Sequence, residues 1–126
     1  MEKEKTCKIV FSDIDGTLLT SDGQITEGTK EMILNLEKKG IPFILTSARS
    51  PEGVRVIKRM LGNHAPIIAF CGGLILDDDG NEIYSKMIPL KRALELKAML
   101  DKDFPAVACN TFGGEKWIVD DRDDWR

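Results

Sequence analysis

The sequence has no long apolar run, no basic cluster and few cysteines. No apolar stretch reaches the roughly 18 residues that a membrane-spanning helix needs, so we expect no membrane association. The charged start MEKEKTCK does not resemble a signal peptide. Lys and Arg total 18 against 21 Asp and Glu, without a basic run, so we expect no nucleic-acid partner. The three cysteines lack CxxC spacing, which favours buried, reduced thiols and a cytoplasmic protein.

The first part of the chain alternates short apolar runs with helical patterns. The runs at 7–11, 41–46 and 66–70 are continuous, as in strands that are buried on both faces. Between them, one helix is expected to begin after Thr26 and end at Gly40, and another to begin at Ser50-Pro51 and end at Gly62. This order predicts an α/β fold with a Rossmann-like parallel sheet and right-handed crossovers.

The pattern changes after residue 70. Two short apolar runs flank DDDGN, which predicts a hairpin over 74–84 with Asp79-Gly80 in its turn. A helix is expected from about residue 89 to 103, followed by strands at 106–112 and 116–120. We therefore predict a first unit at 1–87 and the beginning of an α+β unit at 88–126.

Polar residues follow each of the three predicted parallel strands. Asp13 and Asp15 follow the first, in VFSDIDGTLL; Thr46, Ser47 and Arg49 follow the second; Cys71-Gly72-Gly73 follows the third. Asp and Gly are common in turns, so a simple turn is the alternative for the first group. Because the carboxyl ends of parallel strands share one edge of a sheet, the convergence of these residues favours a ligand site.

Two carboxylates beside hydroxyls suit phosphoryl transfer. One carboxylate can attack phosphorus and form an acyl phosphate, and a second can protonate the leaving oxygen and then deprotonate water. Two close carboxylates are expected to raise the pKa of one of them. A hard cation such as Mg²⁺ would offset the negative charge, and hydroxyls and backbone amides could hold the phosphate oxygens.

The stretch from Asp13 to Leu18, DIDGTL, resembles the first motif of the haloacid-dehalogenase-like hydrolases. The stretch from Ser47 to Ser50, SARS, is similar to the Thr-Gly-Arg segment of the Cof-type branch, and residues 67–88 resemble that branch too. Where the branch usually has Asn-Gly-Ala after the third strand, this chain has Cys71-Gly72-Gly73.

The resemblance implies a Mg²⁺-dependent phosphomonoester hydrolase that forms an aspartyl phosphate and acts on small phosphorylated metabolites, such as sugar phosphates. Asp13 would be the nucleophile and a metal ligand. Asp15 would be the general acid and base, and would give the metal its backbone carbonyl. Ser47 would bind phosphate, assisted by amides near Gly16 and Gly72. Arg49 would either contact substrate or be a surface charge beside the second helix.

Members of the family are longer, and their later motifs supply a lysine and metal-binding carboxylates that do not occur in these 126 residues. The acidic run at 120–124 is interpreted as a solvated segment. The chain is expected to be truncated within the cap. Two alternatives stay open, a phosphomutase and a catalytically incomplete fragment that serves as a binding or assembly module. Self-association through an exposed edge of strand 7–12 is a further expectation.

Three other side chains are given structural roles. His64, the only histidine, is expected to be structural or solvated. Trp117 is expected to lie in the core of the second unit, and Cys71 to be a small buried residue.

Overall fold

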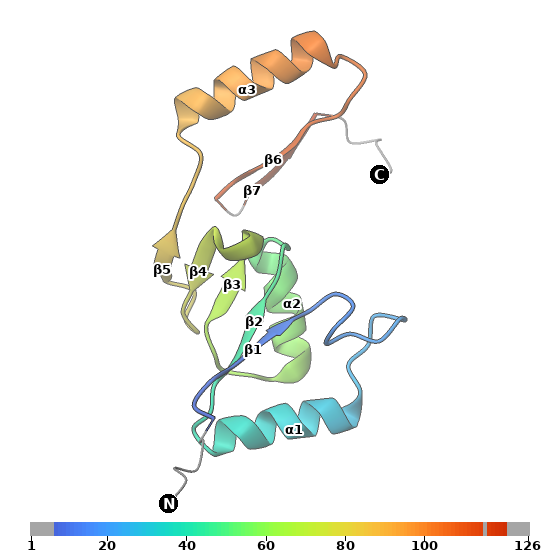
Figure 1. Ribbon diagram of the computed structural model, residues 1–126, viewed down its shortest axis with the longest axis vertical. Coiled ribbons are helices and arrows are strands. Elements are labelled where there is room, and N and C mark those ends of the chain that lie inside the picture. Colours follow the sequence, from blue (N-terminus) through green and yellow to red (C-terminus); the bar gives the residue numbers. More distant parts are fainter. Residues whose placement is uncertain (1–6, 115, 121–126) are drawn as a thin grey trace, which may run out of the picture. The chain divides into compact units, whose positions relative to one another are not determined.

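The computed structural model describes residues 7–114 and 116–120. The chain divides into two compact units, Met1–Ser85 and Lys86–Arg126. In chain order the elements are β1 (Val10–Asp13), α1 (Glu27–Lys38), β2 (Phe43–Thr46), α2 (Pro51–Leu61), β3 (Ile67–Ala69), the 3-10 turn η1 (Phe70–Gly72), β4 (Leu74–Leu76), β5 (Glu82–Ser85), α3 (Leu90–Asp103), β6 (Asn110–Gly113) and β7 (Lys116–Val119) (Figure 1).

The first unit contains a five-stranded sheet in the order β1-β2-β3-β4-β5. The pairs β1–β2 and β2–β3 are parallel, whereas β3–β4 and β4–β5 are antiparallel. The predicted α/β fold is therefore confirmed, with a parallel half that the hairpin β4–β5 extends. Helix α1 contacts β2, α2 contacts β2 and β3, and the two helices also contact each other.

Both helices of this unit begin and end where the sequence predicts. The Thr26 hydroxyl accepts a hydrogen bond from the amide of Thr29 at 3.2 Å and caps α1. The Ser50 hydroxyl caps α2 by accepting from the amide of Gly53, and Pro51 is the first helical residue. Gly62 ends α2 with φ of 70°, in the left-handed region that glycine adopts at little cost.

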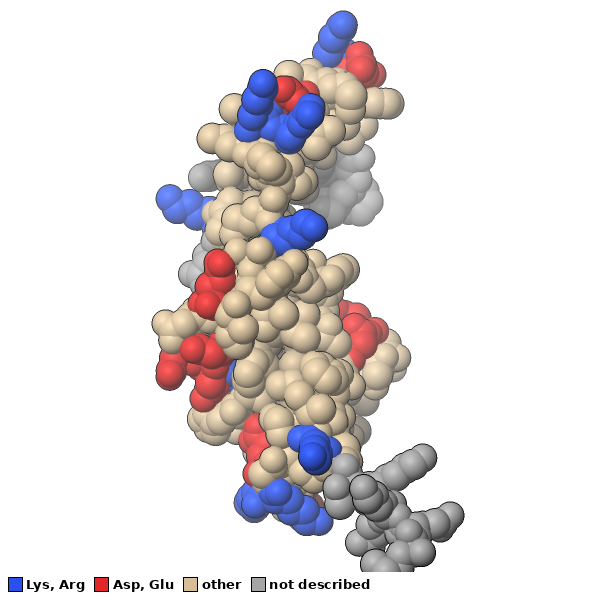
Figure 2. All heavy atoms as spheres, turned by 60° about the vertical axis from the view of Figure 1, so that its left-hand side comes forward, with Lys and Arg blue, Asp and Glu red and all other residues tan. Residues whose placement is uncertain are grey.

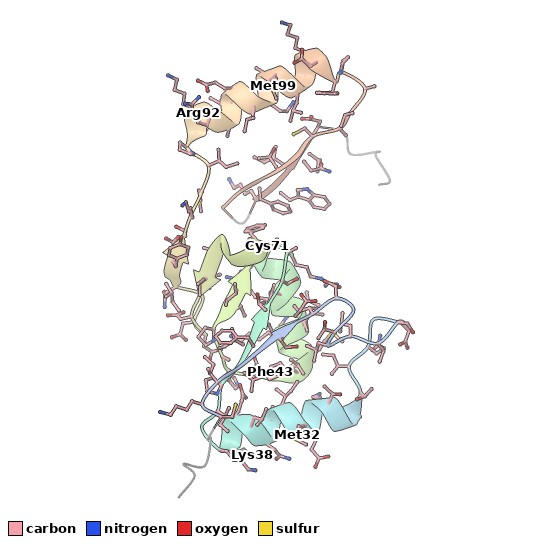
Figure 3. The ribbon with its side chains drawn as sticks, in the orientation of Figure 1. Met32, Lys38, Phe43, Cys71, Arg92 and Met99 are labelled. Atoms are coloured by element: carbon pink, nitrogen blue, oxygen red, sulfur yellow. The ribbon has the colours of Figure 1, made fainter. Side chains whose placement is uncertain are left out.

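The core of the first unit lies between the sheet and the two helices. Helix α2 directs Val54, Ile57 and Leu61 inward, at the spacing of one helical face. They pack in one cluster with buried residues of the sheet, which include Phe43, Leu45, Ile67, Ala69, Leu74 and Leu76. Met32 on α1 points to solvent instead (Figure 3).

Strand β1 differs from its prediction. It begins at Val10 rather than Cys7, and it is an edge strand of the sheet, paired with β2. Its residues alternate between half-buried and exposed, and Phe11 is 58% exposed. The expectation of a strand buried on both faces is wrong for the described residues, because Val10 packs against the core on one face while Phe11 on the other face is exposed.

The second unit consists of α3 and the antiparallel pair β6–β7. The rings of Phe112 and Trp117 stack with centroids 6.0 Å apart. Trp117 is nevertheless 63% exposed, so its predicted place in a core is not what the structure shows. Asp120 pairs with Lys97 and accepts a hydrogen bond from the amide of Cys109, while residues 121–124 of the acidic run lie outside the described residues.

Cysteine exposure also departs from the prediction. All three thiols are free, but Cys7 and Cys71 are exposed and Cys109 is only half-buried. Cys7 lies before the start of β1 at Val10, and Cys71 lies in the turn after β3, so neither is covered. None of the helices in the described ranges is long and apolar enough to cross a bilayer. On the face that Figure 2 shows, basic side chains stand in separate groups rather than in one continuous patch.

Candidate active site

The carboxyl ends of β1, β2 and β3 meet at one edge of the sheet. The register pairs Asp13 with Thr46 and Thr46 with Ile68, so the last residues of β1 and β2 are neighbours. Ser47 follows Thr46 directly and donates its amide to the carbonyl of Ile68 at 3.0 Å. The sheet thus brings the ends of all three strands together, as their order in the sequence suggests.

Ile14 separates the two aspartates and fixes their direction. Its side chain is fully buried, whereas Asp13 and Asp15 on either side of it are exposed. Its carbonyl accepts from the amides of Leu18 and Leu19 at 3.0 and 3.1 Å, which closes the turn after β1. Gly16, with φ of 75°, allows the chain to make this turn. The Thr17 hydroxyl lies 3.4 Å from Oδ2 of Asp13.

Arg49 contacts both oxygens of the Asp15 carboxylate. Its Nε donates to Oδ2 at 2.9 Å and its Nη2 donates to Oδ1 at 2.6 Å. These hydrogen bonds from Arg49 hold the pKa of the Asp15 carboxyl below its usual range. The expectation that the like charge of a neighbouring carboxylate raises a pKa is therefore wrong for Asp15, because the hydrogen bonds and the charge of Arg49 lower the pKa of this carboxyl.

Ser47 is the buried residue directly after β2 at this edge of the sheet. It is 5% exposed, and its hydroxyl accepts from the amide of Arg49 at 3.1 Å. Its carbonyl accepts from the amide of Cys71 at 2.9 Å, and the carbonyl of Arg49 accepts from the amide of Phe70 at 3.0 Å. The loop after β2 and the turn after β3 are therefore hydrogen-bonded into one surface.

The turn after β3 has a strained backbone. Phe70 and Cys71 have φ of 50° and 54°, and Gly72 has φ of 91°. Residues other than glycine rarely adopt this conformation, and where they do, they often border a functional site. Cys71 is exposed there rather than buried as predicted (Figure 3). Its left-handed conformation supplies a reason for the Asn that the Cof-type branch has at this place, since Asn tolerates that conformation.

Magnesium fits this edge in part. Mg²⁺ prefers hard oxygen ligands and is often held by one or two carboxylates together with waters and phosphate oxygens. Asp13 offers an exposed carboxylate, and the turn after it offers backbone carbonyls. Among the described residues no cluster of three or more His, Cys, Asp or Glu side chains could hold a metal. The edge therefore suits a cation that also takes ligands from the substrate.

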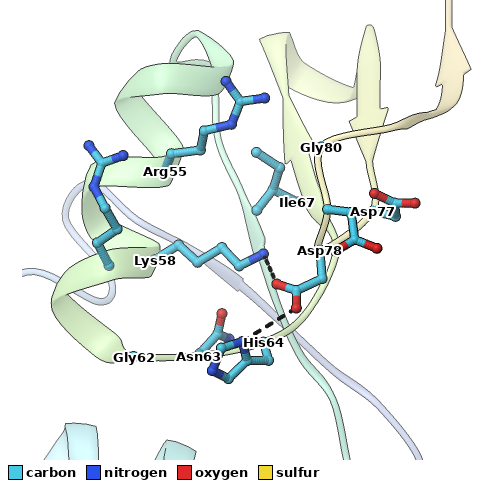
Figure 4. Close-up of a pocket in the computed structure, with 11 residues that line it drawn as sticks. Arg55, Lys58, Gly62, Asn63, His64, Ile67, Asp77, Asp78 and Gly80 are labelled. Atoms are coloured by element: carbon cyan, nitrogen blue, oxygen red, sulfur yellow. Dashed lines mark hydrogen bonds and ion pairs between the residues drawn. The ribbon is translucent and has the colours of Figure 1, made fainter.

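A cavity of about 540 Å³ lies away from this edge, between the C-terminal half of α2, the start of β3 and the hairpin turn (Figure 4). Lys58 and His64 both contact Asp78 there. Asn63 is buried and donates from Nδ2 to the carbonyl of Phe43 at 2.7 Å, while its Oδ1 has no partner among the protein atoms described. His64 thus lines this cavity and does not lie beside Asp13 and Asp15, as expected for a structural or solvated residue.

Sequence reasoning did not foresee the Asp15–Arg49 pair or the left-handed turn. The signal for the pair was the position of both residues just beyond adjacent strand ends. The signal for the turn was the tandem Gly72-Gly73 after Cys71, which marks a backbone that leaves the strand sharply.

Known proteins share both the sequence and the fold. A profile of the haloacid dehalogenase-like hydrolase family matches residues 10–125. A Haemophilus influenzae protein named "Putative phosphatase" is 36% identical over 124 residues, which cover 91% of this chain and 47% of that relative. A haloacid dehalogenase-like hydrolase from Bacillus subtilis superimposes with a TM-score of 0.77 at 25% identity, covering 89% of this chain and 39% of the other.

A haloacid dehalogenase-like hydrolase from Bacteroides thetaiotaomicron has the same fold, with a TM-score of 0.84 at 21% identity, over 94% of this chain and 46% of the other. The chain spans less than half the length of these curated relatives, such as the 41% of a Buchnera aphidicola protein named "Putative phosphatase". The matched profile, the first motif at Asp13 to Leu18 and the shared fold establish that the chain belongs to the haloacid dehalogenase-like hydrolase family.

Proposed function

We propose that the native protein is a Mg²⁺-dependent phosphatase that hydrolyses small phosphorylated metabolites, sugar phosphates among them, through an aspartyl phosphate. The observation that carries this proposal is the pair of exposed carboxylates, Asp13 and Asp15, at the carboxyl edge of the parallel strands. The relative from Haemophilus influenzae, named as a phosphatase, supports the same class of reaction.

In the first step Asp13 attacks the phosphorus of the substrate. An Asp13 oxygen forms a bond to phosphorus while the bond from phosphorus to the leaving oxygen breaks. Asp15 is protonated in this step and has left Arg49, whose hydrogen bonds favour its carboxylate; it gives its proton to that oxygen, so the product leaves as an alcohol. Asp13 suits this role because it is exposed and lies at the very end of its strand.

In the second step water releases the phosphate. Asp15, now a carboxylate, takes a proton from the water while the water oxygen bonds to phosphorus. The bond from phosphorus to Asp13 breaks, which frees inorganic phosphate and restores the nucleophile. The same residue therefore acts first as acid and then as base.

The phosphate group would be held by Ser47 and by backbone amides near Gly16 and Gly72, which lie at the ends of the three strands. A bound Mg²⁺ would be held by the Asp13 carboxylate and the Asp15 carbonyl, and would offset the negative charge that gathers at the edge. A cytoplasmic location accords with three free cysteines, since reducing compartments keep thiols unpaired.

The test compares Asp13→Asn with the wild-type native protein on p-nitrophenyl phosphate and a panel of sugar phosphates with Mg²⁺. We expect Asp13→Asn to lower kcat on the order of 10³-fold or more, since an amide is a poor nucleophile. Asp79→Asn makes the same chemical change at an exposed turn position and should keep wild-type rates. Mass spectrometry after an acid quench should find one phosphoryl group on wild-type protein and none on Asp13→Asn. Wild-type turnover by purified Asp13→Asn would refute the proposal.

A further inference from the structure

We propose that the cavity between α2 and the hairpin turn binds a small neutral compound with several hydroxyl groups, such as a monosaccharide or another polyol. The cavity lies at the C-terminal end of α2, whereas Ser47 and Arg49 lie before its first residue. The proposal therefore concerns a site separate from the candidate active site, goes beyond the proposed phosphatase function and does not rest on it.

The cavity has the size of a small-molecule site. Its volume of about 540 Å³ lies within the range of roughly 300–1,000 Å³ that is usual for ligand pockets, and far exceeds the roughly 30 Å³ that one water occupies in the liquid. Buried Ile67 gives it an apolar patch. A Cβ added at Gly80 would lie 3.3 Å from Nη2 of Arg55, so glycine at this place keeps the space between α2 and the turn open.

A buried acceptor in the lining has no donor from the protein. Asn63 is 3% exposed, and its Nδ2 donates to the carbonyl of Phe43 at 2.7 Å, which fixes the orientation of the side-chain amide. Its Oδ1 has no partner among the protein atoms described. A buried acceptor without a donor is costly and rare in native proteins. The cavity thus calls for a ligand that brings an O–H or N–H group to this oxygen.

The side chains beside Asn63 leave a route to its oxygen. In Figure 4, Asn63 and His64 lie below the pair formed by Lys58 and Asp78. The His64 side chain is 81% exposed, so solvent rather than packing surrounds most of it and the ring can turn aside at little cost. A hydroxyl that enters from this side can donate to Oδ1 of Asn63.

The charges in the lining balance, which favours a neutral ligand. Helix α2 contributes Arg55, Lys58 and Arg59, and the turn contributes Asp77, Asp78 and Asp79. Lys58 pairs with Asp78, and Arg59 pairs with Glu52 at 2.8 Å. An ion of either sign would have to separate such pairs. Hydroxyl groups can donate to the carboxylates and accept from the cations while the pairs stay in place.

The test follows the backbone amides of the native protein by NMR while D-glucose, D-mannitol or myo-inositol is added. We expect at least one of these uncharged probes to shift the amides of Gly62, Asn63 and Gly80 with a single-site Kd of about 1 mM or tighter. The amides of Gly16 and Gly72, which lie at the candidate active site, should stay unchanged.

Two variants test the named contacts. Asn63→Leu removes the acceptor at similar volume and should weaken binding about 10-fold or more. Because it also removes the hydrogen bond to Phe43 and can affect folding, Lys58→Met is the second variant. It keeps the aliphatic stem but loses the ammonium donor, and should weaken binding about 3- to 10-fold. Lys91→Met makes the same change on the exposed surface of α3 and should bind as wild type does. Thermal melts establish which variants are folded.

Charged probes separate this proposal from an ion site. Sodium phosphate and glycine should leave the amides of the cavity unshifted at about 10 mM, ten times the expected Kd. Tighter binding of phosphate or glycine than of all three uncharged probes would overturn the proposal. So would the absence of any shift with the uncharged probes, or wild-type affinity in Lys58→Met or in folded Asn63→Leu.

A crystal structure of the native protein with the tightest uncharged probe gives the final measurement. We expect a hydroxyl of the probe within hydrogen-bond distance of Oδ1 of Asn63. Ordered water at that place, with no probe in the cavity, would show that water alone completes the acceptor and would refute the proposed site. None of these measurements depends on turnover, so the result stands apart from the outcome for the phosphatase function.

Discussion

The amide of Cys71 donates a 2.9 Å hydrogen bond to the carbonyl of Ser47, across a sequence distance that spans all of α2 and β3. Cys71 makes this contact from a left-handed conformation with φ of 54°. The bond ties the turn after β3 to the loop that carries Ser47 and Arg49. Both sides of the candidate site therefore depend on the shape of one short turn.

The first prediction concerns that turn. Cys71→Asn should raise the free energy of unfolding by up to about 1 kcal/mol, because asparagine tolerates the left-handed region better than cysteine does. Urea denaturation of wild type and variant measures the change. Cys7→Asn removes another exposed thiol that does not have positive φ, and should have little effect. An equal or larger gain from Cys7→Asn would show that strain is not the cause.

The second prediction separates two roles of Ser47. Ser47→Ala leaves the partly buried Arg49 amide without its acceptor, which should lower the free energy of unfolding by about 1 kcal/mol. It should also raise KM if the hydroxyl contacts phosphate. Ser47→Thr keeps the hydroxyl and should keep most of the phosphate affinity. Loss of stability with unchanged KM would limit Ser47 to a structural role.

The third prediction concerns pH and the pair of Lys58 and Asp78. The hydrogen bond from Lys58, the largest cause, and the contact with His64 lower the pKa of Asp78. A lowered pKa means that the pair stabilises the fold fully above the ordinary aspartate pKa of about 3.9, and that this contribution is lost as the pH falls through the lower folded-state value.

The measurement for this pair compares Asp78→Asn with wild type by urea denaturation at several pH values. Since Asp78 is partly exposed, the difference at pH 7 should be no more than about 1 kcal/mol. It should shrink towards zero below the lowered pKa of Asp78. Asp79→Asn, in the same turn, serves as control. A difference that grows as the pH falls would contradict the assignment.

The fourth prediction concerns association. We propose that these 126 residues self-associate through the outer edge of β1, where Ile9 and Phe11 are exposed beside backbone groups that face no other strand of the described residues. Phe11→Lys should reduce the associated fraction, because charge on an edge strand opposes pairing. Light scattering after size exclusion measures the mass, and Val56→Lys on α2 is the control. A monomer at high concentration would rule out the association.

Local chemistry made much of the fold predictable. The caps at Thr26 and Ser50 and the stop at Gly62 are read from single residues, because a helix end needs a side-chain acceptor or a left-handed residue. The hairpin around Asp79-Gly80 is equally local. Asp77 donates its amide to the Asn81 carbonyl there at 2.9 Å, and Gly80 has φ of 89°.

Features that depend on distant neighbours could not be predicted. The apolar run before Asp13 shows what a strand can bury, but not which neighbours are present, so the exposure of Phe11 was missed. Arg49 and Asp15 are 34 residues apart, and whether an arginine turns towards a carboxylate or a ligand depends on side-chain packing that no local pattern records. The exposure of Trp117 was missed for the same reason, because it too depends on which neighbours surround the residue in the fold.

The edge position of β1 also has a consequence for amide hydrogen exchange. In a parallel pair, one strand directs half of its backbone groups towards its neighbour and half away from it. Because β1 pairs with β2 alone among the described strands, its outward amides have no strand opposite them. The strand that carries Asp13 should therefore exchange its outward amides with solvent deuterium much faster than β2, which is paired on both sides. Slowing of that exchange, amide by amide, would report directly on any segment that joins the sheet beside the candidate nucleophile.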